Sequence, residues 1–302
     1  MATRELHGSP RILPLYARAA AATFVPGAGR LPFLPGGSGA AEIPTDLVLE
    51  RPDVAIDPGH LAAYAKVCRF GLRDVVPATY LHVVAFPLHL ALMSDGRFPF
   101  GAVGLVHVAN RIVQHRPVCL DETVSMRVHA TALEPLPRGR SFKIVSEARV
   151  VDELVWSDES TILRREKTRD RGQAKVEARP AEEQPGPPPV RAQWRLPGDL
   201  GRRYASVSGD RNPIHMHDMP AKLLGFPRTI AHGMWTKARC LAALESRLPE
   251  SFSAEARFRK PVLLPSTVTF GEESEAGAIR FAVRAARDGA PHLDGRVGPL
   301  AG

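Results

Sequence analysis

"HGMWTKARCLAALESRL" (residues 232–248) predicts a buried helix, because its apolar residues recur near a 3.6-residue period at Met234, Ala238, Leu241 and Leu248. Three segments of strand-like character follow, namely "EARFRKPV" (255–262), "STVTFGEE" (266–273) and "AIRFAVRAA" (278–286). A sheet must bury one face, so one helix followed by a run of strands predicts an antiparallel sheet curled round that helix.

The first part of the chain has the same plan. "PATYLHVVAFPLHLALM" (77–93) predicts the helix, with an expected kink at Pro87. The strand-like segments that follow are "GLVHVANRIVQHRPV" (104–118), "ETVSMRVHATALE" (122–134), "RSFKIVSEARVVD" (140–152) and "LVWSDESTILRR" (154–165).

Short motifs also recur in register. "HRPVCLDETVSMRV" (115–128) matches "RKPVLLPSTVTFGE" (259–272), with K/R-P-V followed by T-V six residues after the proline. Tyr64 and Tyr204 precede these prolines by 53 and 57 residues. Coincidence between short motifs is the alternative, but the shared order and spacing favour a duplicated unit.

A charged, proline-rich stretch between the two parts is typical of a linker. The expected organisation is an extension (1–44), a first unit (45–163), a linker (164–194) and a second unit (195–302). Both units have the size of ordinary domains.

Composition narrows the class of protein. The chain has 302 residues, is 44% hydrophobic and has no apolar run long enough to span a membrane, so we expect a globular protein without a membrane span. Three dispersed cysteines give neither a disulfide framework nor a C-x-x-C pair, which favours the cytoplasm. The net charge of +8 suits an anionic partner, although nucleic acid is disfavoured because aromatics make up only 6%.

"SGDRNPIHMHD" (208–218) concentrates chemistry-bearing side chains. Pro213 prevents a continuous helix between Asp210 and His215, so the chain bends there and both side chains can point into one space. A carboxylate and an imidazole that share one water can move protons near neutral pH. The alternatives are an ordinary polar turn and a metal site made by His215, His217 and Asp218; the metal site is disfavoured because no further spaced ligand pair supports it.

Gly233 stands where the predicted helix of the second unit begins. Its N–H is then accessible at the positive end of the helix, which suits an oxyanion. The alternatives are that Gly233 only relieves crowding, and that the adjacent His232 is a satisfied core histidine.

The pattern Y-A-x-V-S-G-D-x-N-P-I-H (204–215), followed by G-F-P-x-x-I-A-H-G-M (225–234), resembles the signature of the MaoC-like, type 2 enoyl-CoA hydratases. The whole chain resembles the double-hotdog 3-hydroxyacyl-thioester dehydratases of actinobacteria. The resemblance implies an α+β double hotdog, in which two antiparallel sheets, each curled round a central helix, form a pseudo-dimer. It implies an R-specific hydro-lyase of fatty acid metabolism that adds water reversibly to 2-enoyl thioesters carried by coenzyme A or acyl carrier protein, with no metal or other cofactor.

The resemblance also implies roles for individual residues. Asp210 and His215 would be the catalytic pair, Asn212 would help to orient them, and the Gly233 N–H would bind the thioester oxygen. The first unit reads "VCRFGLRDVVPATY" (67–80) at the matching place, so we expect one active site per chain, with the first unit receiving the acyl tail.

In hydration, one member of the pair would take a proton from water while the other protonates the α-carbon; His215 is favoured as the base, but the sequence leaves the division open. The side chains expected to contact the phosphate of the carrier are Lys222, Arg228, Lys237, Arg259 and Lys260. The alternative is that they are solvated surface charges without a binding role. Monomer and homodimer are both open. The rival functions are a hotdog thioesterase and a non-catalytic acyl-thioester-binding subunit.

Overall fold

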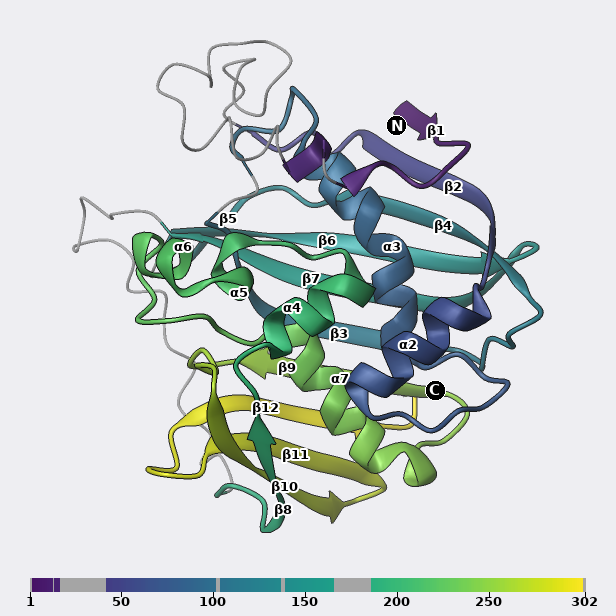
Figure 1. The fold of residues 1–302 in the computed structure, drawn as a ribbon. Helices are drawn as coiled ribbons and strands as arrows, with labels where there is room; N and C mark the ends of the chain where they lie inside the picture. The colour runs from purple at the N-terminus through teal and green to yellow at the C-terminus, as the bar shows by residue number, and fades with distance from the viewer. Residues whose placement is uncertain are drawn as a thin grey trace.

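The computed structural model describes residues 2–12, 14–16, 42–101, 104–136, 139–165 and 186–300. Its strands form one sheet in the order β1-β2-β4-β6-β7-β3-β9-β12-β11-β10-β8, with β5 paired to β6. Figure 1 shows the helices α2, α3, α4 and α7 together on one face of this sheet.

The first unit begins with β2 (Leu47–Ala55), α2 (Pro58–Cys68) and α3 (Ala78–Met93). Its remaining strands are β3 (Val106–Gln114), β4 (Thr123–Ala130), β5 (Glu134–Leu136), β6 (Gly139–Val150) and β7 (Glu153–Arg165). Before it, β1 (Ala2–Glu5) pairs with β2 in parallel. The predicted helix and all four predicted strands of this unit are confirmed.

The second unit contains β8 (Val190–Leu196), α4 (Leu200–Ser208), α5 (Pro213–Met216), α6 (Asp218–Leu223), α7 (Gly233–Leu244) and the 3-10 turn η2 (Glu245–Arg247). Its other strands are β9 (Phe252–Phe258), β10 (Ser266–Glu275), β11 (Ala278–Ala285) and β12 (Pro291–Gly298). The predicted helix and three strands are confirmed, and β8 and β12 are additional.

The strand order is mirrored about the centre of the sheet. β3 pairs antiparallel with β9, and outward from this pair the order is β7-β6-β4-β2 on one side and β12-β11-β10-β8 on the other. Each unit therefore contributes its helix and strands in the same sequence, which is the arrangement expected from a duplication. The repeated tyrosines meet across the two units, since the rings of Tyr64 and Tyr204 lie 6.3 Å apart.

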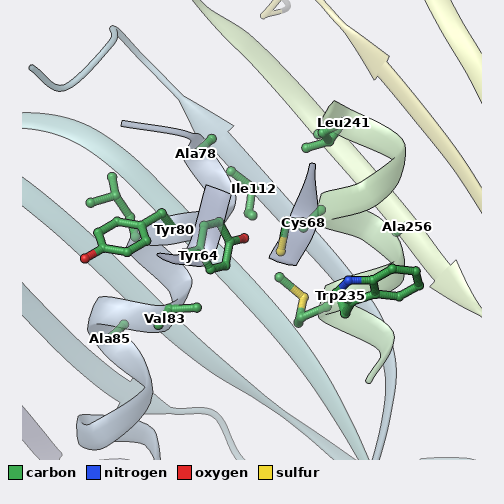
Figure 2. Packing of buried hydrophobic residues seen from close by; sticks show 14 of the residues in the cluster. Tyr64, Cys68, Ala78, Tyr80, Val83, Ala85, Ile112, Trp235, Leu241 and Ala256 are labelled. Carbon is green, nitrogen blue, oxygen red and sulfur yellow. The ribbon is translucent and has the colours of Figure 1, made fainter. Parts of the chain in front are cut away.

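The core lies between the helices and the concave face of the sheet. β4 turns Val124, Met126 and Val128 inward, at alternate positions, towards α3. Figure 2 shows Tyr64 and Cys68 of α2 between residues of α3 and α7. The Trp235 indole N–H also donates to the Val67 carbonyl at 3.1 Å, which ties α7 to α2.

α3 continues as one helix through Pro87, and packing buries most of its length. The kink expected at Pro87 stays a prediction. The expected bounds of the linker (164–194) need correction, because β7 and β8 extend into it from both ends; β8 pairs with β10, and Trp194 stacks on Phe270 with ring centroids 4.9 Å apart. Residues 166–185, the middle of that stretch, lie outside the described residues.

Within the ranges given above, no helix is both long enough and apolar enough to pass through a bilayer. The central helices are buried because they are enclosed by the sheet and by each other.

Candidate active site

The segment between α4 and α7 carries the predicted site. α4 ends at Ser208, and its cap residue Gly209 has a left-handed φ of 74°, which turns the chain out of the helix. The Asn212 side chain then caps α5 by accepting from the Ile214 N–H, and Pro213 is the first residue of that helix. This turn and cap place His215 on the same side of the chain as Asp210.

The corresponding segment of the first unit is much shorter. α2 ends at Cys68 and α3 begins at Ala78, whereas α4 ends at Ser208 and α7 begins at Gly233. The first unit therefore has no counterpart of α5 and α6, the two short helices that surround the predicted pair.

One oxygen of the Asp210 carboxylate is hydrogen-bonded, and the carboxylate is partly exposed. Its Oδ1 accepts from the Tyr16 hydroxyl at 2.7 Å and from the Asn212 backbone N–H at 3.1 Å. Its Oδ2 lies 3.7 Å from His232 Nε2, and the side chain is 28% exposed. The Asn212 backbone therefore contacts Asp210, and the Asn212 side chain caps the helix that carries His215.

The orientation of His215 fixes its tautomer. Its Nδ1 lies 2.8 Å from the Ile230 carbonyl oxygen, which can only accept, so the proton is on Nδ1 and the lone pair is on Nε2. The ring stacks on His232, with centroids 3.6 Å apart. His232 in turn donates from Nε2 to the Asp210 carbonyl at 2.9 Å.

These contacts bring Asp210, His215 and His232 together, with one side-chain ligand atom of each within 4.8 Å of the others. Such a trio has the residue types and spacing of a candidate metal site. The metal site considered from the sequence is not assembled, because His217 is exposed and Asp218 instead accepts from the Thr229 N–H and hydroxyl.

Electrostatics set the resting protonation. Burial raises the pKa of the Asp210 carboxyl, but the nearby His232 and His215 and the Tyr16 hydrogen bond outweigh it, so this pKa is lowered. Burial lowers the pKa of His215 from its ordinary value of 6.5, although Asp210 opposes the shift. Burial and the adjacent His215 lower the pKa of His232 to about 3. At neutral pH the site holds one carboxylate and two neutral imidazoles.

Gly233 is the first residue of α7, where an N–H has no acceptor within the helix. A Cβ at this position would lie 3.0 Å from the Phe258 ring, so the backbone here is packed directly against β9. Gly233, Asp210, His215 and His232 all line one cavity of about 290 Å³.

The cavity spans both units. From the second unit it is lined by the residues above together with Tyr204, Phe258 and Val262, and from the first by side chains of α3, β3, β6 and β7. At its second-unit wall, the exposed Arg259 and Lys260 are the two expected phosphate contacts among the lining residues. Lys222 and Arg228 are not among them.

The expectation for Lys237 is wrong. This side chain is fully buried, and its ammonium donates to the Ala254 carbonyl at 2.9 Å and to the Asn110 side chain. Burial lowers its pKa to about 7. It is unavailable to an external phosphate because it faces the sheet from the inner side of α7.

Two neighbours of the pair have no role in the chemistry expected from the sequence. Tyr16 comes from the extension (1–44), and its hydroxyl also accepts from the Arg211 N–H at 2.9 Å. For His232 the sequence offers the alternative of a satisfied core histidine, and the structure places it against both Asp210 and His215. The histidine next to a predicted helix start was a usable signal, whereas nothing local marked Tyr16.

Tyr16→Phe is expected to lower kcat about tenfold with the fold intact. The phenyl ring keeps the packing, but Asp210 loses a hydrogen bond to a charged group, the kind that is worth about 1.5–3 kcal/mol. Because that hydrogen bond lowers the pKa of Asp210, its loss should also raise the pKa of the carboxyl. Steady-state kinetics and circular dichroism check this, and an unchanged kcat would show that Tyr16 only fills space.

Gly201→Ala is expected to displace His215. A Cβ at Gly201 of α4 would overlap the backbone carbonyl oxygen of His215, so α5 must move away. We expect at least a tenfold loss of kcat, because misplaced catalytic groups are costly, and a destabilisation of about 1–3 kcal/mol from overpacking.

Gly198→Ala is the matched control for this substitution. Its added Cβ would lie 3.6 Å from Pro265 Cδ, an ordinary contact. Equal activity of the two variants would contradict the packing argument.

Comparisons with known proteins show the family of this chain. The family model described as "MaoC like domain" matches residues 180–290. The 3-hydroxyacyl-thioester dehydratase X of Mycobacterium tuberculosis is 37% identical over 270 residues, which cover 89% of this chain and 94% of that protein. The chain belongs to the MaoC-like dehydratases. The expected family is therefore confirmed.

Solved structures extend the match to the fold. HtdX of Mycobacterium tuberculosis gives a TM-score of 0.74 at 35% identity, covering 84% of this chain and 100% of that one. A MaoC-like dehydratase of Phytophthora capsici gives 0.67 at 17% identity over 84% and 95% of the two chains, which shows the shared fold. A further Mycobacterium tuberculosis protein, described as a double hotdog fold, gives 0.50 at 17% identity over 82% and 93%. The predicted double hotdog is confirmed.

Proposed function

We propose that this MaoC-like dehydratase is a (3R)-hydroxyacyl-thioester dehydratase that also runs in reverse as a hydratase of trans-2-enoyl thioesters. The observation that carries the proposal is the convergence of Asp210, the free Nε2 of His215 and the start of α7 at Gly233 on one cavity. The relative of 37% identity, named as a 3-hydroxyacyl-thioester dehydratase, supports the same reaction.

The resting protonation suggests how the proton moves in hydration. Asp210 is ionised and His215 is neutral, so neither holds a spare proton for the α-carbon. His215 Nε2 takes a proton from the water as its oxygen bonds to the β-carbon, and Asp210 accepts the second O–H of that water and orients it. His215 then returns the same proton to the α-carbon. This account replaces the expectation that one member takes a proton while the other donates one.

Gly233 has the electrostatic role. Attack at the β-carbon moves an electron pair through the α-carbon onto the thioester oxygen, which becomes enolate-like. The unpaired N–H at the start of α7 would stabilise this charge as it develops. Dehydration follows the same path in reverse, because elimination passes through the same enolate.

The carrier of the acyl group is coenzyme A or acyl carrier protein, both of which bring phosphate. Arg259 and Lys260 are the proposed phosphate contacts, because they are exposed and line the cavity. Residues 195–302 would supply the chemistry and residues 45–163 would receive the acyl tail. A cytoplasmic monomer or homodimer fits the proposed reaction.

We further propose that the protein groups act without a metal or other cofactor. His215 Nδ1 and His232 Nε2 are already committed to backbone carbonyls, and this orients His215 for the proposed proton transfer. Hydration measured with and without chelator should give equal rates. A metal-dependent rate would assign the trio to an ion.

The purified chain tests the function through crotonyl-CoA. The proposal predicts loss of the enoyl absorbance without release of free thiol, and formation of the R alcohol. Thiol release would indicate a thioesterase. Unchanged absorbance with crotonyl-CoA and with longer enoyl-CoA substrates would leave only a binding role.

The pH profile tests the protonation states. His215 acts as a base only when neutral, and its pKa is lowered, so kcat/KM for hydration should stay level as pH falls to about 6.5 and decline only below it. The lowered pKa of Asp210 places protonation of the carboxylate below its ordinary value of 3.8. A decline that begins well above pH 6.5 would contradict the neutral imidazole.

A further inference from the structure

The cavity continues from the Asp210/His215 pair into the first unit, where the acyl tail would lie. There its apolar wall is interrupted by polar side chains. The apolar residues include Val83, Leu90, Ile144 and Ile162, and the polar ones are His82, His89, His107 and Ser160. An alkyl tail alone gives no reason for imidazoles in its path.

A buried network holds most of these groups in place. The fully buried Asp158 of β7 accepts from Asn110 Nδ2 at 2.6 Å, from the Ser160 hydroxyl at 2.9 Å and from His82 Nδ1 at 3.2 Å. His89 Nε2 lies 2.6 Å from the Ser146 hydroxyl. Lys237 completes the network by donating to Asn110. The groups around Asp158 are anchored because they hydrogen-bond to one another across α3, α7, β3 and β7. His89 is held separately, by Ser146 of β6.

His107 differs from the other three. The β3 register shifts between His107 and Ala109, and such a bulge re-aims a side chain. Its ring lies 6.2 Å from the His82 ring and 5.0 Å from the Phe258 ring. Its Nε2 is buried and has no hydrogen-bond partner among the residues that the structure describes. Since Phe258 also packs on Gly233, His107 is one aromatic ring away from the proposed oxyanion donor.

The cost of leaving the His107 nitrogen unpaired favours a polar group in this part of the cavity. A buried polar group without a partner costs about 1–3 kcal/mol, so a hydrocarbon tail against His107 would leave that cost in place. A hydroxyl can donate to or accept from an imidazole nitrogen in either tautomer. An anionic tail is disfavoured, because Asp158 is already a fixed negative charge and burial lowers the pKa of His89 and His107 to about 3, which keeps both neutral.

We propose that the tail pocket in the first unit recognises acyl thioesters whose tail carries a hydroxyl group, bound by His107. This proposal rests on the proposed function, because it names the substrate class of the same site. It predicts which of two substrates of equal length is preferred. An apolar pocket discriminates against a hydroxylated tail, whereas this pocket should prefer it.

The test is a series of trans-2-enoyl-CoA substrates with a terminal hydroxyl, each compared with the unsubstituted substrate of equal length. We expect kcat/KM of the wild-type protein to favour the hydroxylated partner about tenfold at one chain length. His107→Phe, which keeps an aromatic ring beside Phe258, should abolish this preference. Leu90→Met changes an apolar part of the same wall and should retain it.

The outcomes separate the two proposals. Hydration of crotonyl-CoA together with a preference for the plain substrate at every length would overturn the hydroxyl proposal and leave the proposed function standing. Failure to hydrate any member of the series would overturn the proposed function itself. The kcat/KM values of the wild-type protein alone show which substrate is preferred, even if His107→Phe does not fold.

Discussion

Asp210→Asn and His215→Gln are each expected to lower kcat by about 10²–10⁴-fold, because each removes a group that we propose to act on the reacting water. The asparagine keeps the shape of Asp210 and can still accept from Tyr16, but it is not a base. The glutamine keeps a polar side chain at His215 without an imidazole. Initial rates with crotonyl-CoA measure the effect, and thermal unfolding verifies the fold.

His217→Gln is the matched control for the histidine. His217 is exposed and lies two residues from His215, so this substitution should leave kcat unchanged. A large loss in His217→Gln would revive the metal site made by His215, His217 and Asp218. Near-normal turnover in Asp210→Asn or His215→Gln would refute the catalytic assignment.

Gly233→Pro is expected to lower kcat about 10²–10³-fold relative to Gly233→Ala, because proline removes the N–H proposed to stabilise the oxyanion. Proline is well tolerated at the first position of a helix. The preceding residue, His232, has φ −67° and ψ 138°, which is the extended conformation that a residue before proline adopts.

Gly233→Ala is the control because it shares the steric problem. Both substitutions add a Cβ that meets the Phe258 ring at 3.0 Å, but only alanine keeps the donor. The kcat ratio of the two variants therefore isolates the N–H. Equal rates would show that this glycine serves only to relieve crowding, the alternative that the sequence left open.

The fold was largely predictable because the helix and strand periods recur in two units. Of the strands that sequence reasoning missed, β12 has little strand character of its own. β12 reads "PHLDGRVG" and is formed because β9 and β11 supply partners on both sides. β8 follows a proline-rich stretch and is fixed by its pairing with β10.

The proximity of Asp210 and His215 was predictable because they lie five residues apart in one bent segment. Tyr16 was not, since it contacts Asp210 from 194 residues away. The polar network around Asp158 likewise joins α3, β3, β7 and α7, which no local pattern relates. Lys237 was the avoidable error, because its spacing from Met234 and Leu241 places it on the buried stripe of α7.

The central claim is that Asp210 and His215 act as a unit on one water, and the double variant Asp210→Asn/His215→Gln tests it most directly. Residual hydration of crotonyl-CoA would be compared among the wild-type protein, both single variants and the double variant. If the two groups act together, the residual kcat of the double variant should be within a few-fold of the kcat of the less active single variant. A double variant whose loss equals the product of the two single losses would contradict the account.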